Sequence, residues 1–99
     1  MKTVFSTVGI VGAGAMGRGI AQLAAQAGST VLLFDSQSVV VPAALADVCA
    51  QWDRLREKGR MDQASVDACK ARLRQAHALS DLASCELVVE AIEIGRAHV

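Results

Sequence analysis

The sequence has few aromatic residues, no net charge and no long hydrophobic run. Phe and Trp make up 3% of the 99 residues, and tyrosine is absent, so the chain offers no surface on which nucleic-acid bases would stack. Ten basic side chains balance ten acidic ones, which leaves no positive field for nucleic acid or anionic lipid. No uncharged run reaches the roughly 18–20 apolar residues of a membrane span. We therefore expect neither a nucleic-acid partner nor a membrane.

Paired cysteines and a secretory signal are also missing. Cys49, Cys69 and Cys85 are odd in number and widely spaced, without a C-x-x-C pair. This spacing favours buried, reduced thiols over a metal or redox site. The N-terminus lacks the charged region and cleavage site of a signal peptide. These features together predict a cytoplasmic protein.

What the sequence does contain is a hydrophobic β–α–β pattern. Hydrophobic residues make up 53% of the chain, enough for one packed domain. Residues 4–11 and 30–34 are short apolar runs that predict buried strands, and residues 15–27 predict a helix between them. Its expected sheet-facing stripe comprises Met16, Ile20, Leu23, Ala24 and Ala27. Such tight connections imply parallel strands and a right-handed crossover.

Two further helices and a last strand follow. The first helix starts near Pro42 and ends near Gly59, and the second opens at Asp62. Their apolar stripes comprise Leu45, Val48, Cys49, Trp52 and Leu55 in the first helix, and Val66, Cys69 and Leu73 in the second. A link through His77 leads to a brief helix capped near Ser80 and Asp81. Residues 86–92 then predict another buried strand.

The informative motif is G-x-G-x-x-G, formed by Gly12, Gly14 and Gly17. It follows a predicted strand and opens a predicted helix, which is the context that dinucleotide binding requires. Gly12 permits the tight turn, Gly14 lets a pyrophosphate approach the backbone, and Gly17 lets the helix pack on the strand. Free N–H groups at the helix start would face the phosphates. The alternative is a purely structural glycine turn.

Asp35 ends the second predicted strand, 23 positions after Gly12. A carboxylate there accepts hydrogen bonds from the adenosine ribose and would repel a 2′-phosphate, and no arginine follows to receive one. The sequence therefore favours NAD over NADP as the cofactor. The alternative is a solvated loop acid.

Weaker candidates lie outside this motif. His77 has no partner that would make it a catalytic base, and a surface or structural role is favoured. Lys58 lies among Arg54, Arg56 and Arg60, where a solvated helix face competes with an anion site. Glu90 borders the expected cofactor crevice, and the sequence leaves open whether it touches the ligand.

Four stretches together resemble the N-terminal domain of the 3-hydroxyacyl-CoA dehydrogenases. They are VGIVGAGAMGRGIAQLAAQAG, VLLFD, the helical pair, and DLASCELVVEAI. The likeness covers residues 4–92 and is greatest for the bacterial 3-hydroxybutyryl-CoA and 3-hydroxyadipyl-CoA type. It implies an α/β fold, a partial Rossmann sheet of strand order 3-2-1-4 with a helical hairpin inserted between the second and third strands. The apolar pattern of the sequence does not itself locate that third strand.

The resemblance also implies a reaction and a set of contacts. The family oxidises the 3-hydroxyl of an acyl-CoA to a ketone in fatty-acid or aromatic-acid degradation, with hydride transfer to NAD. The implied cofactor-binding residues are Gly12, Ala13, Gly14, Ala15, Met16, Gly17, Asp35, Glu90 and Ala91. Lys58 matches a lysine near the coenzyme A phosphates, and a hydroxylated contact of the family falls imperfectly at Gln51. The family's catalytic His and dimer-forming domain match nothing here, so we assign no catalytic residue and expect the 99 residues to be inactive.

The last residues depart from the family pattern. Residues 94–99, IGRAHV, are what one frame of a common sequencing adapter encodes. We therefore expect residues 1–93 to be an incomplete NAD-binding domain and 94–99 a non-native tail, the alternative being a divergent natural sequence. Two other interpretations stay open: an NAD(H)-sensing module of a regulator, and a fragment that folds too poorly to bind anything. The expected oligomer, implied by the family, is a homodimer through a further domain.

Overall fold

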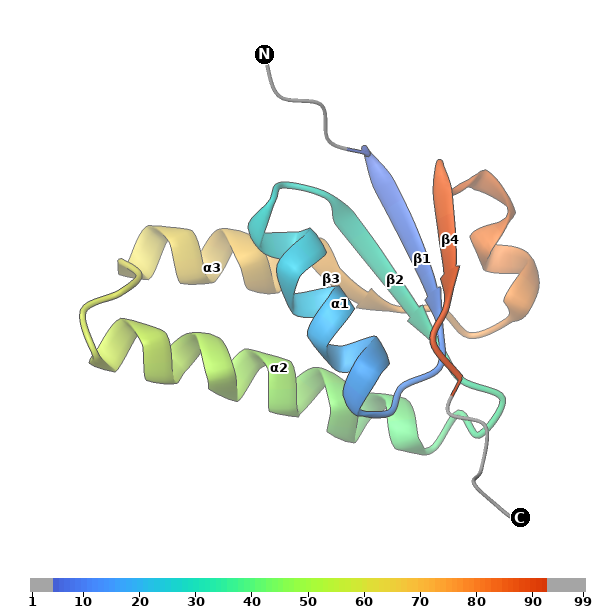
Figure 1. The fold of residues 1–99 in the computed structure, drawn as a ribbon, viewed down its shortest axis with the longest axis horizontal. Coiled ribbons are helices and arrows are strands. Elements are labelled where there is room, and N and C mark those ends of the chain that lie inside the picture. Colours follow the sequence, from blue (N-terminus) through green and yellow to red (C-terminus); the bar gives the residue numbers. More distant parts are fainter. Residues whose placement is uncertain (1–4, 93–99) are drawn as a thin grey trace.

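The computed structural model describes residues 5–92 and shows a parallel sheet with helices on both faces (Figure 1). The four strands lie in the order β3-β2-β1-β4. Their bounds are Thr7–Val11 for β1, Thr30–Phe34 for β2, Leu73–Gln75 for β3 and Leu87–Glu90 for β4. The predicted α/β class and the strand order 3-2-1-4 are confirmed.

Three α-helices and one 3-10 helix connect these strands. They are α1 (Ala15–Gln26), α2 (Val40–Glu57), α3 (Gln63–Arg72) and the 3-10 helix η1 (Leu79–Ser84). α2 and α3 form the predicted hairpin between β2 and β3, and α1 packs against both of them (Figure 1). Side chains alternate between the two faces of a strand. Ile10 faces α1, whereas a Cβ on Gly9 would lie 3.0 Å from Leu82 of η1, so η1 covers the opposite face.

The hairpin is held by the apolar residues that the sequence pattern identified. Val48 and Trp52 of α2 and Val66 of α3 are buried, while Leu45, Cys49 and Leu55 pack at the edge of this core. The indole N–H of Trp52 donates to Gln26 at 2.9 Å. Asp62 caps α3 as predicted, because its carboxylate accepts the Ser65 N–H at 2.8 Å. An ion pair of 2.9 Å between Lys70 and Asp53 joins the two helices.

The predicted buried stripe of α1 is wrong for Met16, Leu23 and Ala27, which are exposed, whereas Ile20 and Ala24 are partly buried against the core as expected. Gly17, Ala21 and Ala25 are the buried residues of this helix, whereas the exposed fractions of Met16 and Leu23 are 54% and 68%. The helix lies so close to the sheet that only glycine and alanine fit between them. The smallest residues therefore face the sheet, and the larger apolar residues are rotated toward its rim.

Two boundaries and the burial of one strand also differ from the sequence expectations. Leu73 begins the short strand β3 instead of ending a helix, because it pairs in parallel with Val31 of β2. Ala78, not Ser80, is the N-cap of η1. The last strand was expected to be buried, but β4 is largely exposed because it pairs only with β1 and forms the edge of the sheet described here.

Candidate functional site

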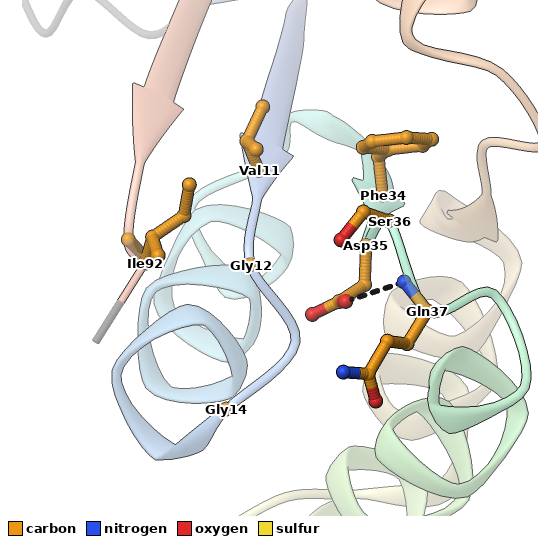
Figure 2. A pocket seen from close by; sticks show the side chains of 9 residues that line it. Val11, Gly12, Gly14, Phe34, Asp35, Ser36, Gln37 and Ile92 are labelled. Carbon is orange, nitrogen blue, oxygen red and sulfur yellow. Dashed lines mark hydrogen bonds between the residues drawn. The ribbon is translucent and has the colours of Figure 1, made fainter. Parts of the chain in front are cut away.

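A pocket of about 320 Å³ opens where the carboxyl ends of β1, β2 and β4 meet (Figure 2). Crevices at this edge of an open parallel sheet are the usual ligand sites of α/β proteins. The pocket is lined by Val11, Gly12, Gly14, Phe34, Asp35, Ser36, Gln37, Ala91 and Ile92. It therefore brings together three segments that are far apart in the sequence.

Two of the motif glycines are required by the backbone itself. Gly12 has a φ of +116°, and a Cβ there would lie 2.8 Å from the Ala91 carbonyl oxygen. A Cβ on Gly17 would lie only 1.8 Å from the Gly12 carbonyl oxygen. The predicted turn at Gly12 and the predicted close packing at Gly17 are both confirmed. Without these glycines the loop could not pass between β1 and α1 on its present path.

The N-terminus of α1 presents uncapped donors beside this loop. Its N-cap is Gly14, which has no side chain that could accept a capping hydrogen bond, and the first turn contains no acidic residue. The first intrahelical bond runs from the Arg18 N–H to the Gly14 carbonyl oxygen, 2.9 Å. The N–H groups before Arg18 have no acceptor within the helix. Together with the helix dipole they form a site that suits a phosphate group.

Asp35 projects from the end of β2 between the glycine loop and the next turn. One carboxylate oxygen, Oδ2, accepts the Ala13 N–H at 2.9 Å, and the other, Oδ1, accepts the Gln37 N–H at 2.9 Å. Figure 2 shows the second of these bonds. No lysine or arginine is among the residues that line the pocket. The pocket therefore offers an acceptor for hydroxyl groups and, within the described part of the chain, no cation for a second phosphate.

The remaining predicted cofactor residues differ in burial and in whether they line the pocket. Ala91 lines the pocket and is 2% exposed, whereas the neighbouring Glu90 is exposed and lies outside the lining. Ala13 is buried under Asp35, and Met16 is exposed in the first turn of α1. Ala15 lines a second cleft. Only the placement of these residues is observed, and their contacts with a cofactor stay predictions.

Sequence reasoning missed five residues of the lining. They are Val11, Phe34, Ser36, Gln37 and Ile92. Val11 precedes the first motif glycine, and Phe34, Ser36 and Gln37 lie within two residues of Asp35, so their positions beside these predicted residues were the available signal. Ile92 had no such signal, because its place depends on the pairing of β4 with β1.

The second cleft, of about 290 Å³, lies between α1 and α2. Arg18 and Gln51 line it, and the Arg18 guanidinium is ion-paired with Asp47. Lys58 is not part of this lining, because it is the exposed C-cap of α2. An 18-residue helix rises about 1.5 Å per residue, so Lys58 lies roughly 27 Å along α2 from its start beside the first pocket. The structure thus does not bring Lys58 to the Asp35 pocket.

Other titratable groups in residues 5–92 do not form a second reactive site. His77 is exposed as predicted, and Arg56 pairs with Asp53 at 3.9 Å and Glu57 at 3.8 Å. Burial raises the pKa of all three cysteine thiols, which makes them poor nucleophiles. Within this range no three His, Cys, Asp or Glu residues group so as to hold a metal ion. None of the helices in this range is both long enough and apolar enough to cross a bilayer.

Comparison with known proteins decides the family. Residues 7–94 match the family model for the 3-hydroxyacyl-CoA dehydrogenase, NAD binding domain. The chain belongs to this family. A probable 3-hydroxybutyryl-CoA dehydrogenase of Deinococcus radiodurans is 38% identical over 84 residues, which cover 85% of this chain and 30% of that protein. The 3-hydroxyadipyl-CoA dehydrogenase of Escherichia coli K12 is 32% identical over 88 residues, 86% of this chain and 18% of that protein.

Solved structures agree with this family assignment. The crystal structure of (S)-3-hydroxybutyryl-CoA dehydrogenase from Ralstonia eutropha superimposes with a TM-score of 0.86 at 36% identity. The match covers 93% of this chain and 32% of that one. The chain therefore spans about a third of the length of this relative. The expected boundary between residues 1–93 and 94–99 lies outside the described residues and stays a prediction.

Proposed function

We propose that the pocket at the carboxyl edge of the sheet holds NAD. The residues present fit this cofactor, because Gly12 and Gly14 line the pocket without side chains that would obstruct it, and the uncapped N–H groups of α1 lie beside it. The pyrophosphate would bind the N–H groups at the start of α1, and the adenosine ribose would bind Asp35. The proposed contacts are Gly12, Ala13, Gly14, Ala15, Met16, Gly17, Asp35, Glu90 and Ala91.

The observation that carries this proposal is the position of Asp35 in a pocket whose described lining has no basic side chain. A ribose with free hydroxyls can use the acceptors of the carboxylate, whereas a 2′-phosphate would meet a negative charge. The NAD-binding domain model that matches residues 7–94 supports the same cofactor.

We further propose that the protein oxidises a 3-hydroxyacyl-CoA to a 3-oxoacyl-CoA. The names of the relatives support this reaction class, in which NAD accepts the hydride. This chain's residues would bind and orient the cofactor, and none of them is assigned to proton removal. We therefore expect residues 1–99 alone to be inactive. A homodimeric, cytoplasmic protein in fatty-acid or aromatic-acid degradation is the corresponding expectation.

Lys58 is the proposed contact for coenzyme A. Its exposed position at the end of α2 leaves its ammonium group accessible to a phosphate. Coenzyme A affinity should fall in Lys58→Ala and stay unchanged in the control Arg74→Ala, which alters an exposed cation of β3. A non-catalytic NAD(H) sensor would have no reason to show this dependence, so equal affinities would favour the sensor.

The test of the cofactor proposal is a nucleotide titration of Asp35→Ser combined with Ser36→Arg. NAD should bind more weakly and NADP more tightly than in the unaltered chain. Each lost charge-assisted hydrogen bond should cost about 1.5–3 kcal/mol of binding free energy. Asp81→Ser is the matched control, since Asp81 also accepts two backbone N–H groups but lies on η1. Unchanged NAD affinity in the double variant would remove Asp35 from the site.

A further inference from the structure

We propose that Asp35 is also a positioning residue, whose carboxylate fixes the glycine loop before any nucleotide binds. This inference concerns the structure of the nucleotide-free loop, and only its effect on cofactor choice rests on the proposed function. The ribose contact requires lone pairs of the carboxylate that face the pocket. The anchoring role uses a different lone pair, on the oxygen Oδ2, which accepts the Ala13 N–H at 2.9 Å.

The geometry shows why this bond matters for the loop. The parallel pairing of β1 with β2 ends at Val11 and Phe34. One main-chain bond follows, from the Gly12 N–H to the Phe34 carbonyl oxygen at 2.7 Å. The next donor along the loop, the Ala13 N–H, is met by the Asp35 side chain instead of the backbone. Asp35 therefore continues the attachment of β1 to β2 by one residue into the glycine loop.

Burial makes this acceptor difficult to replace. Ala13 is 6% exposed, so water has little access to its N–H if Asp35 is shortened. Leaving a buried donor without an acceptor destabilises the fold by the full desolvation free energy of that group. The second bond, from the Gln37 N–H to the other carboxylate oxygen at 2.9 Å, holds the carboxylate in the orientation that Ala13 needs. The loop and the turn after β2 are thus connected through one side chain.

Two properties of Asp35 therefore separate. Its negative charge is what opposes a 2′-phosphate, whereas the bond to Ala13 needs an acceptor at the position of Oδ2. A carboxylate has about four acceptor sites, and the backbone occupies two of them here. Asp35→Asn removes the charge and the acceptor of the Gln37 N–H but keeps one oxygen, which can still accept from Ala13. Asp35→Ala removes both charge and acceptor, and its glycine loop should lose its attachment.

Amide hydrogen exchange in the nucleotide-free, full-length chain tests the anchor. The measured quantity is the exchange rate of the Ala13 amide divided by that of Leu33 in the core of β2, so that a general loss of stability cancels. In Asp35→Ala this ratio should rise by about ten- to a hundredfold, as expected for the loss of a charge-assisted bond. In Asp35→Asn it should rise by less than about tenfold. Asp35→Leu, which is close to aspartate in shape and has no acceptor, is the second variant if Asp35→Ala does not fold.

Asp81→Ala is the matched control. It removes a carboxylate that accepts the His77 and Ala78 N–H groups at 3.0 and 3.1 Å, and it should expose those amides without affecting Ala13. An unchanged Ala13 ratio in Asp35→Ala, or equal ratios in the Asn and Ala variants, would overturn the anchoring role. The outcome is independent of the cofactor proposal. A chain that fails to bind NAD would refute that proposal and leave the exchange result standing.

Discussion

Replacing Gly17 by alanine tests the contact between the glycine loop and α1. A Cβ at this position would lie 1.8 Å from the Gly12 carbonyl oxygen and 2.9 Å from its carbonyl carbon, and real Cβ atoms essentially never approach closer than 3.0 Å. Both neighbours are backbone atoms, so no side-chain rotation can relieve the overlap. Either α1 moves away from the sheet, or the loop leaves its position at the mouth of the pocket.

The magnitude follows from two opposing terms. Overpacking a well-packed region costs about 1–3 kcal/mol, and a backbone clash belongs at the upper end. Alanine in place of glycine in a helix otherwise stabilises it by about 0.5–1 kcal/mol. Gly19 isolates this second term, because it is in the same helix and a Cβ there would meet nothing within 4 Å. The propensity gain is common to both variants and cancels, so they should differ by the overpacking term alone, about 1–3 kcal/mol in the free energy of unfolding.

Urea unfolding provides the assay. With a slope of about 1–3 kcal/mol per M for a small protein, the midpoints of Gly17→Ala and Gly19→Ala should differ by about 1–2 M. Gly19→Ala should unfold at slightly higher urea than the unaltered chain, and Gly17→Ala at much lower urea. NAD affinity should fall only in Gly17→Ala. Equal midpoints for the two variants would show that the loop does not pack on α1 at this distance.

Four other outcomes are expected. The bond from the Ser65 N–H lowers the pKa of Asp62 below its ordinary value of 3.8. The carboxylate therefore stabilises the fold above pH 3.8 and loses this effect as the pH falls from 3.8 toward the lower pKa of the folded state. Asp62→Asn should flatten this loss of stability. Burial raises the pKa of Cys69, so its alkylation by iodoacetamide should be slow until urea unfolds the chain, and fast labelling in native buffer would contradict its burial. Val88 is 46% exposed on the edge strand β4, where open edges promote association; Val88→Lys should reduce self-association in analytical ultracentrifugation, and an unchanged distribution would exclude this edge as its cause. The purified chain should not reduce NAD with a 3-hydroxyacyl-CoA. A base within hydrogen-bond reach of the substrate contributes about 10²–10⁴ in rate, and His77 is not expected to act as that base. Turnover that is abolished by His77→Ala would refute this expectation.

The sequence alone determined the features that depend on local patterns. The glycine motif between an apolar run and a helix predicted the β1–α1 turn, and Asp35 after the next apolar run identified the acid at the end of β2. The apolar spacing around Trp52 and the capping residue Asp62 likewise located the hairpin. Each of these signals lies within a few residues of the structure it specifies, because strand alternation, helix periodicity and capping are short-range properties.

Only the tertiary structure decided which surfaces meet. Periodicity placed a stripe on α1 but could not show that Ala21 and Ala25, rather than Leu23, face the sheet. That choice depends on how closely the helix approaches β1. The short strand β3 exists because Leu73 pairs with Val31, a partner far away in the chain. Ala91 likewise reaches the pocket only because β4 pairs with β1. Long-range pairing and interhelical distance are set by the packing of the whole domain, and no short stretch of sequence contains them.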